Sequence, residues 1–295
     1  MRLFQVDAFT GDAFAGNPAA VCLLGGPAEP RWMQSVAGEM NLSETAFVEP
    51  RPAGYGLRWF TPAAEVALCG HATLASAHVL YQTGLAEPQQ QVRFDSASGP
   101  LTARRDDGLI VLDFPARPAA QAPPPPGLLA ALGVASPVWT GLAKEDLMVV
   151  LGREEEVTGL RPDIAALAGL GTRGVIVTAP ALRPDADFVS RFFAPAVGVP
   201  EDPVTGSAHC TLAPFWAQRL GRPALTGYQV SARGGTVRVR AAGERVLLGG
   251  HAVTVFSGHL SDAALPADGV TLHPPGVGGG VEKTTGPGDG ADPPE

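Results

Sequence analysis

An internal repeat constrains the fold of this chain more than any other feature. RWFTPAAEVALCGHATLASAHVLYQTG and SRFFAPAVGVPEDPVTGSAHCTLAPFWAQRLG each predict a strand, an F-x-P turn and a glycine-led helix that ends at glycine. A predicted two-strand hairpin follows each of them. Three matched pairs keep nearly the same offset along the sequence: Gly70 and Gly206 (136 residues), Ser96 and Ser231 (135), and the hairpin-turn residues Gly108 and Gly243 (135). This ordered series indicates a duplicated fold rather than a chance match.

Residues 70–82 and 206–220 are predicted to be the central helices of the two repeats. Apolar residues occur on all sides of both segments, which is typical of buried helices. Short apolar segments around them, such as LIVLDF and AVTVFSG, predict strands. We therefore expect an α+β fold with two pseudo-symmetric halves, each a curved antiparallel sheet wrapped around a central helix. Pro214 should kink the second helix or free a carbonyl.

The sequence predicts four consecutive regions. The N-terminal half spans residues 1–118, and a proline-rich linker follows at 119–127, within PAAQAPPPPG. Four consecutive prolines favour an extended chain and forbid a helix or a central strand. The C-terminal half spans residues 128–265. Residues 266–295 have little to bury and are expected to be a flexible tail.

Composition excludes several classes of protein. The net charge is −8 and no basic stripe is visible, which disfavours nucleic-acid binding. No run approaches the ~18 apolar residues of a membrane span. The three cysteines lie far apart, and the N-terminus lacks the apolar stretch of a secretory signal. These features predict a reduced cytoplasmic protein with neither nucleic acid nor membrane as partner.

The two glycine-led helix starts predict a binding site. Gly70 and Gly206 each lie where a turn leads into the N-terminus of a central helix, and unpaired N–H groups and a positive dipole end point out of such a terminus. If the two halves face these termini toward one cleft, the cleft would hold an anion. A carboxylate of a small-molecule substrate is the simplest anion of this kind.

Glu44 is the best candidate for acid–base chemistry. It precedes the apolar strand TAFV, where a carboxyl would be half removed from water, a setting useful for proton transfer. The alternative is that NLSE caps a short helix or turn, with Asn41 as the cap and Glu44 three residues later.

Six further residues stand in or near the repeated motif. His71 follows Gly70 at the helix start and can be a catalyst or a packed or capping residue, whereas His78, two turns later, is expected to be structural. Asp202 precedes proline, which also fits a turn, and Ser207 fits a helix N-terminus. His209 and Cys210 follow in the first helical turns, and their roles stay open.

Cys69 suggests a different chemistry. A thiol at a helix N-terminus has a lowered pKa and can act as a proton-transfer base. A racemase with two thiols would have a second cysteine at the matching position of the repeat. That position holds Thr205, so the pair is incomplete.

Common cofactor and metal motifs do not fit this sequence. GLGTRG (169–174) follows a helix-like stretch and precedes a strand, the wrong order for dinucleotide binding. No P-loop, nucleophile elbow or metal-type histidine spacing occurs. We expect neither cofactor nor metal.

Four motifs together resemble the PhzF family of phenazine-biosynthesis-like isomerases. They are DAFTGDAFAGNPAAVCLL, NLSETAFV, FTPAAEVALCGHATLASA and GVPEDPVTGSAHCTLAPFWA, which keep the family order within residues 1–260. The resemblance implies the fold of diaminopimelate epimerase, with the active site in the cleft between the halves, and a possible homodimer.

The resemblance also implies roles for individual residues. Glu44 falls at the family's proton-transferring glutamate, and His71, Asp202 and Ser207 fall at its active-site histidine, aspartate and serine. Gly70 and Gly206 fall at its helix-start glycines, which are taken to hold the substrate carboxylate. Cys69 is a departure, because the phenazine enzyme proper need not have it, so the resemblance does not imply phenazine synthesis.

Three functions follow from these observations. The first is a cofactor-independent isomerase that moves a proton within a small carboxylate, with Glu44 as acid–base. The second is an epimerase or racemase of an amino or cyclic imino acid, with Cys69 and Glu44 as opposed bases. The third is a non-catalytic ligand-binding protein of the same fold.

Overall fold

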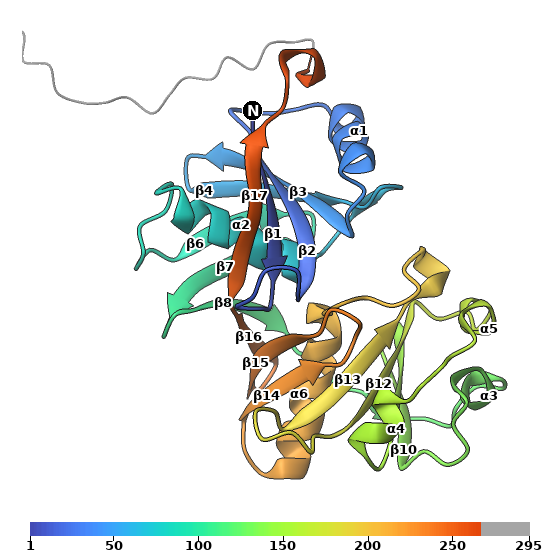
Figure 1. The fold of residues 1–295 in the computed structure, drawn as a ribbon. Helices are drawn as coiled ribbons and strands as arrows, with labels where there is room; N and C mark the ends of the chain where they lie inside the picture. Colours follow the sequence, from blue (N-terminus) through green and yellow to red (C-terminus); the bar gives the residue numbers. More distant parts are fainter. Residues whose placement is uncertain (267–295) are drawn as a thin grey trace, which may run out of the picture.

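The computed structural model describes residues 1–266, which form two lobes joined by one continuous sheet (Figure 1). The first part of the chain contains helices α1 (Pro30–Met40) and α2 (Gly70–Gln82). Its strands are β1 (Arg2–Ala8), β2 (Asn17–Leu23), β3 (Glu44–Arg51), β4 (Gly54–Phe60), β5 (Glu65–Val66), β6 (Val92–Ser96), β7 (Gly99–Asp106) and β8 (Leu109–Pro115).

The second part of the chain adds nine strands and four α-helices within the described residues. The strands are β9 (Ala120–Gln121), β10 (Trp139–Ala143), β11 (Asp146–Val150), β12 (Gly174–Pro180), β13 (Phe188–Phe193), β14 (Ala224–Gln229), β15 (Gly235–Ala242), β16 (Arg245–Gly250) and β17 (Ala252–His259). The helices are α3 (Leu128–Leu132), α4 (Glu154–Thr158), α5 (Ile164–Ala168) and α6 (Gly206–Leu220), with 3-10 turns at Pro195–Val197 and Asp262–Ala264.

The order of strand pairings is the same in both lobes. In the first lobe β1–β2 and β3–β4 are antiparallel, β2–β3 and β4–β6 are parallel, and β6, β7 and β8 form an antiparallel meander. In the second lobe β10–β11 and β12–β13 are antiparallel, β11–β12 and β13–β14 are parallel, and β14, β15 and β16 form the meander. A duplicated fold requires this agreement.

The expectation of purely antiparallel sheets was wrong. Four pairs are parallel, and the pairing of β8 with β16 joins both lobes into a single mixed sheet. Parallel neighbours need a crossover connection, which usually contains a helix. The crossovers here contain α1, α2, the α4–α5 pair and α6, so the helices between the strands set these directions.

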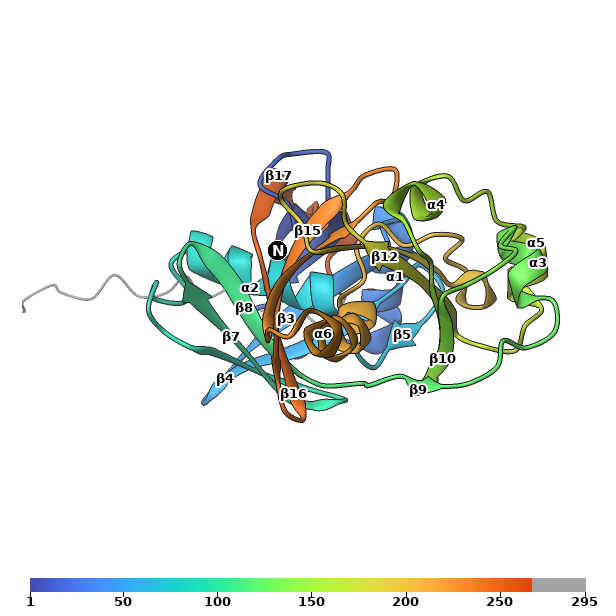
Figure 2. The same cartoon turned by 90° about the horizontal axis from the view of Figure 1, so that it is seen from below.

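The two central helices begin and end at the predicted residues. α2 is buried along most of its length, and it contacts α6 as well as β1, β2, β3, β7, β8 and β17. α6 packs on β14, β15 and β16, and Figure 2 shows it enclosed by strands of the second lobe. One apolar core surrounds both helices.

Pro214 frees a carbonyl inside α6, as predicted. A proline has no N–H, so it cannot bond to the carbonyl of the residue four positions earlier, Cys210. That carbonyl instead accepts a hydrogen bond of 3.0 Å from the backbone N–H of Arg117. The segment that leaves β8 is thereby fixed to the second central helix.

Each repeat ends with a strand that pairs with the other lobe. β9 follows the first repeat and pairs with β10, and β17 follows the second repeat and pairs with β1 along its whole length. The predicted boundaries at 118 and 265 stay a prediction. The predicted tail at 266–295 lies outside the described residues except for Pro266. No helix within residues 1–266 is long and apolar enough to cross a membrane.

Candidate active site

The N-termini of the two central helices meet at a cavity of about 560 Å³ between the lobes. A Cβ placed on Gly70 would lie 3.3 Å from the Cα of Gly206, which is tighter than most Cβ contacts, so a larger residue at either position would require the backbones to shift apart. Within residues 1–266, no side chain caps either helix start. The first-turn N–H groups are therefore available to an anion.

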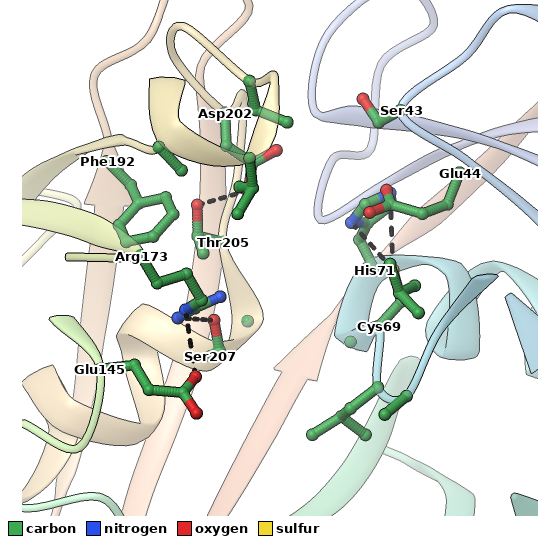
Figure 3. Close-up of a pocket in the computed structure, with 18 of the residues that line it drawn as sticks. Ser43, Glu44, Cys69, His71, Glu145, Arg173, Phe192, Asp202, Thr205 and Ser207 are labelled. Atoms are coloured by element: carbon green, nitrogen blue, oxygen red, sulfur yellow. Dashed lines mark hydrogen bonds and ion pairs between the residues drawn. The ribbon is translucent and has the colours of Figure 1, made fainter. Parts of the chain in front are cut away.

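All six residues that the sequence predicted for the site line this cavity. They are Glu44, Gly70, His71, Asp202, Gly206 and Ser207. Figure 3 shows that Glu44 and His71 lie on the wall of the first lobe, whereas Asp202 and Ser207 lie on the opposite wall. Their roles in catalysis or binding remain proposals.

Glu44, Cys69 and His71 form one cluster on the first wall. Glu44 Oε2 lies 3.0 Å from His71 Nε2, as an ion pair without aligned hydrogen-bond geometry. Within residues 1–266 this buried oxygen accepts no hydrogen bond, so its lone pairs are available to another group. The Cys69 sulfur lies 3.5 Å from His71 Nδ1. Glu44 is the first residue of β3, so the idea that Asn41 caps a helix containing it was wrong; Asn41 ends α1 instead.

Asp202 is held by hydrogen bonds from both lobes. The Thr205 hydroxyl donates to Asp202 Oδ2, and the Asn17 amide donates to Asp202 Oδ1 at 2.8 Å. The Gln229 amide donates to the backbone carbonyl of Asp202 and to the Thr205 hydroxyl. Asp202 therefore has a fixed position in front of α6.

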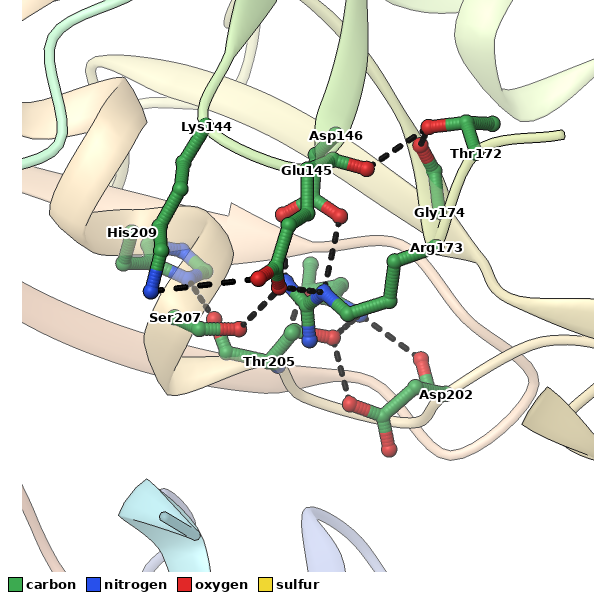
Figure 4. A network of polar contacts seen from close by, with 11 residues as sticks. Lys144, Glu145, Asp146, Thr172, Arg173, Gly174, Asp202, Thr205, Ser207 and His209 are labelled. Carbon is green, nitrogen blue, oxygen red and sulfur yellow. Dashed lines mark hydrogen bonds and ion pairs between the residues drawn. The ribbon is translucent and has the colours of Figure 1, made fainter. Parts of the chain in front are cut away.

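Arg173 contributes a fixed positive charge to the second wall. The buried Asp146 carboxylate accepts two hydrogen bonds from its guanidinium, which also donates to the Ser207 hydroxyl at 3.2 Å (Figure 4). Lys144 and Glu145 extend beside it, with Lys144 Nζ 3.8 Å from Glu145 Oε1. The carboxylates of Asp146 and Glu145 both lie next to the Arg173 guanidinium, with Glu145 Oε2 3.8 Å from Arg173 Nε. They hold the guanidinium beside Ser207 at the start of α6.

Burial and neighbouring charges set the protonation of this site. Burial raises the pKa of the Cys69 thiol to about 11, with a further rise from the Glu44 charge, so the thiol keeps its proton at neutral pH. Burial also raises the pKa of Asp202 to about 6, although His71 and the bonds from Thr205 and Asn17 favour its charged form. Burial opposes the charged form of His71, yet the charges of Glu44 and of a Cys69 thiolate raise its pKa well above the ordinary value; while the thiol keeps its proton, the second of these two charges is absent.

The Glu44–Cys69–His71 cluster also has the residue types of a zinc site. The three ligand atoms lie within 4.8 Å of one another. A histidine that binds a metal through one ring nitrogen normally donates the other N–H to an acceptor. If Nε2 bound the ion beside Glu44, Nδ1–H would face the Asn17 amide nitrogen, which is itself a donor. The surroundings of the ring therefore fit proton transfer better than a metal.

Sequence reasoning missed two residues of the site. Asn17 lies in one of the family-like motifs, and Arg173 lies in the rejected GLGTRG string. Neither side chain is a typical acid–base catalyst, and neither stands in a local motif typical of catalysis. Both are placed at the site by contacts with residues distant in the sequence. His78 bonds to Thr254 on β17, in agreement with a structural role. His209 is fully buried and lies outside the cavity lining, whereas Cys210 is part of that lining.

The sequence matches a described protein family along most of its length. Residues 6–258 match the PhzC-PhzF family, described as phenazine biosynthesis-like protein. An uncharacterised isomerase of Pseudomonas aeruginosa is 52% identical over 260 residues, which cover 88% of this chain and 98% of that protein. An uncharacterised isomerase of Halalkalibacterium halodurans is 47% identical, with 88% and 97% covered. Relatives that are about 50% identical to this chain are thus named as isomerases.

Solved structures show the same fold. A PhzF-family protein of Enterococcus faecalis superposes with a TM-score of 0.83 at 43% identity, covering 87% of this chain and 97% of that one. A probable proline racemase of Agrobacterium radiobacter gives a TM-score of 0.58 at 13% identity, with 90% and 94% covered. The second likeness concerns the fold alone.

Proposed function

This chain belongs to the PhzC-PhzF family of phenazine biosynthesis-like proteins, and we propose that it is a cofactor-independent isomerase in which Glu44 moves a proton within a small carboxylate. The observation that carries this proposal is the free Oε2 of Glu44. This oxygen is buried 3.0 Å from His71 Nε2 and accepts no aligned hydrogen bond within residues 1–266, and the Glu44 residue lines the cavity where the two helix starts meet. A carboxylate held in this way has lone pairs that no aligned protein hydrogen bond occupies, so it can act as a proton acceptor.

Groups from both lobes support binding of the substrate carboxylate. The N–H groups at the starts of α2 and α6, the Ser207 hydroxyl and the Arg173 guanidinium offer hydrogen-bond donors and positive charge to one region. Leu68, Val66 and Phe192 add apolar surface to the lining. This combination suits a small acid with an apolar or cyclic body.

The proposed reaction is a proton shift that leaves the enzyme unchanged. The Glu44 carboxylate takes a proton from an acidic carbon of the substrate, and the C–H electron pair moves into an adjacent unsaturated system. The same proton then returns to another carbon of that system, which restores the carboxylate. Substrate and product are isomers, and the step needs no oxidant. In D₂O, a proton held on Glu44 between the two transfers can exchange with solvent, so the substrate or product can take up deuterium.

The alternative with Cys69 as a base has less support. Its thiol has a raised pKa because it is buried, which opposes formation of the thiolate that would act as the base. The matching position of the other repeat is Thr205, whose hydroxyl is used to bond Asp202. An epimerase with two opposed thiols therefore does not fit this site.

Proton exchange in D₂O tests the proposal across a panel of candidate acids. Small β,γ-unsaturated and cyclic dienoic acids would be incubated with the protein, and ¹H NMR would follow loss of C–H signals and appearance of isomers. For an acid that exchanges, Glu44→Gln should lower the rate by about 10²–10⁴-fold, because it keeps the shape and removes the base.

Two further variants make this test specific. Glu49→Gln changes another glutamate of β3, outside the cavity lining, and should keep wild-type exchange. Cys69→Ser should retain exchange if Glu44 is the base. An active Glu44→Gln together with an inactive Cys69→Ser would instead establish the thiol as the base and refute the proposal.

A further inference from the structure

We propose that Asn17 is a positioning residue of this site, whose amide keeps the His71 ring proton on Nε2, facing Glu44, and connects His71 to Asp202 across the cavity. The inference rests on the proposed function. Asn17 begins β2 in the first lobe and is fully buried, while Asp202 belongs to the second lobe. A single side chain thus touches both walls.

The contacts of Asn17 fix the orientation of its amide. Its Nδ2 lies 2.8 Å from Asp202 Oδ1 and 2.9 Å from the Val204 carbonyl oxygen, and both of these groups are acceptors. A reversed amide would place its oxygen against these two oxygens, which is unfavourable. The Asn17 oxygen instead faces the Ser43 hydroxyl, which donates at 3.4 Å. The side of Asn17 that faces Asp202 and His71 is therefore a donor.

This orientation determines which ring nitrogen of His71 keeps a proton. Nδ1 lies 3.1 Å from the Asn17 nitrogen and 3.5 Å from the Cys69 sulfur, and the thiol keeps its hydrogen at neutral pH. The two hydrogens of the Asn17 nitrogen go to Asp202 and the Val204 carbonyl, and neither this nitrogen nor the protonated thiol is a good acceptor for a proton on Nδ1. Nδ1 therefore stays without a proton. The ring proton then lies on Nε2, 3.0 Å from the Glu44 carboxylate.

Asn17 also opposes full protonation of His71. The charged and titratable groups that face this ring are Glu44 on β3, Cys69 before α2 and Asp202 before α6. The Glu44 charge favours an imidazolium. The rise in the pKa of His71 that a Cys69 thiolate would cause is absent while the thiol keeps its hydrogen, and a second proton on Nδ1 would face the Asn17 amide nitrogen, which cannot accept it. A neutral ring leaves the Glu44 carboxylate free to accept a substrate proton rather than to pair with a full positive charge.

The protonation of each ring nitrogen can be measured directly. ¹⁵N-histidine labelling and two-bond ¹H–¹⁵N spectra distinguish Nδ1–H from Nε2–H, and His71→Asn identifies the signals. In the wild-type protein at neutral pH we expect a proton on Nε2 and none on Nδ1. A proton on Nδ1 in the wild-type protein would overturn the proposal without any variant.

Asn17→Asp is the decisive variant, because it keeps the shape and replaces a donor by an acceptor. We expect a proton on Nδ1 at neutral pH and exchange slower by about 10–100-fold. The rate should recover as the pH falls, because the protonated carboxyl can again donate to Asp202. Asn17→Ala, which adds no charge, should move the proton in the same direction. Asn41→Gly changes the only other asparagine, at the left-handed end of α1, and should change neither quantity.

The outcomes separate this inference from the proposed function. If both Asn17 variants leave the two ring nitrogens and the pH profile as in the wild-type protein, the role of Asn17 is wrong, even with Glu44→Gln inactive. If Glu44→Gln stays active, the proposed function is wrong, whatever the NMR spectra show.

Discussion

Single buried side chains in this protein acquire their charge state from the lobe around them. His209 is fully buried, its Nδ1–H donates to the Thr205 carbonyl at 2.8 Å, and its Nε2 has no partner within residues 1–266. Burial lowers the pKa of this ring from 6.5 to about 4, although the bond to Thr205 favours the charged form. The folded protein therefore holds His209 neutral.

This lowered pKa predicts a loss of stability in acid. Between pH 6.5 and about 4 the unfolded chain binds a proton at this position and the folded chain does not, so the His209 contribution is present above pH 6.5 and lost as pH falls toward 4. His209→Gln should show a smaller drop in Tm between pH 7 and pH 5 than the wild-type protein. The exposed His251→Gln should keep the wild-type drop, and equal slopes for all three proteins would contradict the prediction.

At the residue scale the sequence identified groups that carry their own chemistry. Glu44, His71 and Asp202 were singled out because they stand beside a strand or helix start, and the resemblance to the PhzF family then favoured a site role over a capping or turn role. All three line the cavity. Asn17 and Arg173 could not be found in this way. Asn17 matters through its distance from Asp202, 185 positions later, and Arg173 through its contacts with Asp146 and Ser207.

The two central helices form the junction on which the site depends. Gly70 and Gly206 face each other, and a Cβ on either would lie 3.3 Å from the Cα of the other. Each of Gly70→Ala and Gly206→Ala should destabilise the fold by about 1–3 kcal/mol, because extra atoms in a packed contact force the backbones apart. Urea unfolding measures both free energies.

The double variant tests whether the helices meet as described. The two added methyl groups compete for the same space, so the combined loss should differ from the sum by about 0.5–3 kcal/mol. Gly84→Ala, at the exposed end of α2 with open space around it, serves as an uncoupled partner for either change. Additive losses in the Gly70–Gly206 pair would refute the contact.

Helices and strands could be predicted where the pattern of apolar residues was clear. The relative directions of paired strands could not be predicted. The boundaries of α2 and α6 followed from continuous apolar character between flanking glycines. α1 was missed, although Pro30 at its first turn and the buried Met33, Val36 and Ala37 are a usable signal. Strand directions were missed because they depend on crossover helices, which an alternating pattern does not report.

At the scale of the whole molecule, β17 determines whether the first lobe is complete. It pairs with β1 along its whole length, and His78 of α2 bonds to Thr254 on it. A chain that stops after Gly250 loses these backbone hydrogen bonds, each worth about 0.5–1.5 kcal/mol, so it should lose about 3 kcal/mol or more. Hydrogen exchange should show lost protection in β1 and α2, whereas a chain that stops after Pro266 should match the full protein. Retained protection in the shorter chain would contradict this.

The late position of β17 in the sequence also affects folding during synthesis, because β17 pairs with β1 at the start of the chain. The ribosome completes β8 about 140 residues before it completes β17, which at roughly 5–20 residues per second is a wait of roughly 7–30 s. During that interval the emerging first lobe has an unpaired β1 edge, the kind of surface on which chains associate wrongly. We expect a translating ribosome to carry this protein as an unfinished intermediate, so chaperone occupancy on nascent chains should persist until residues 252–259 have left the exit tunnel.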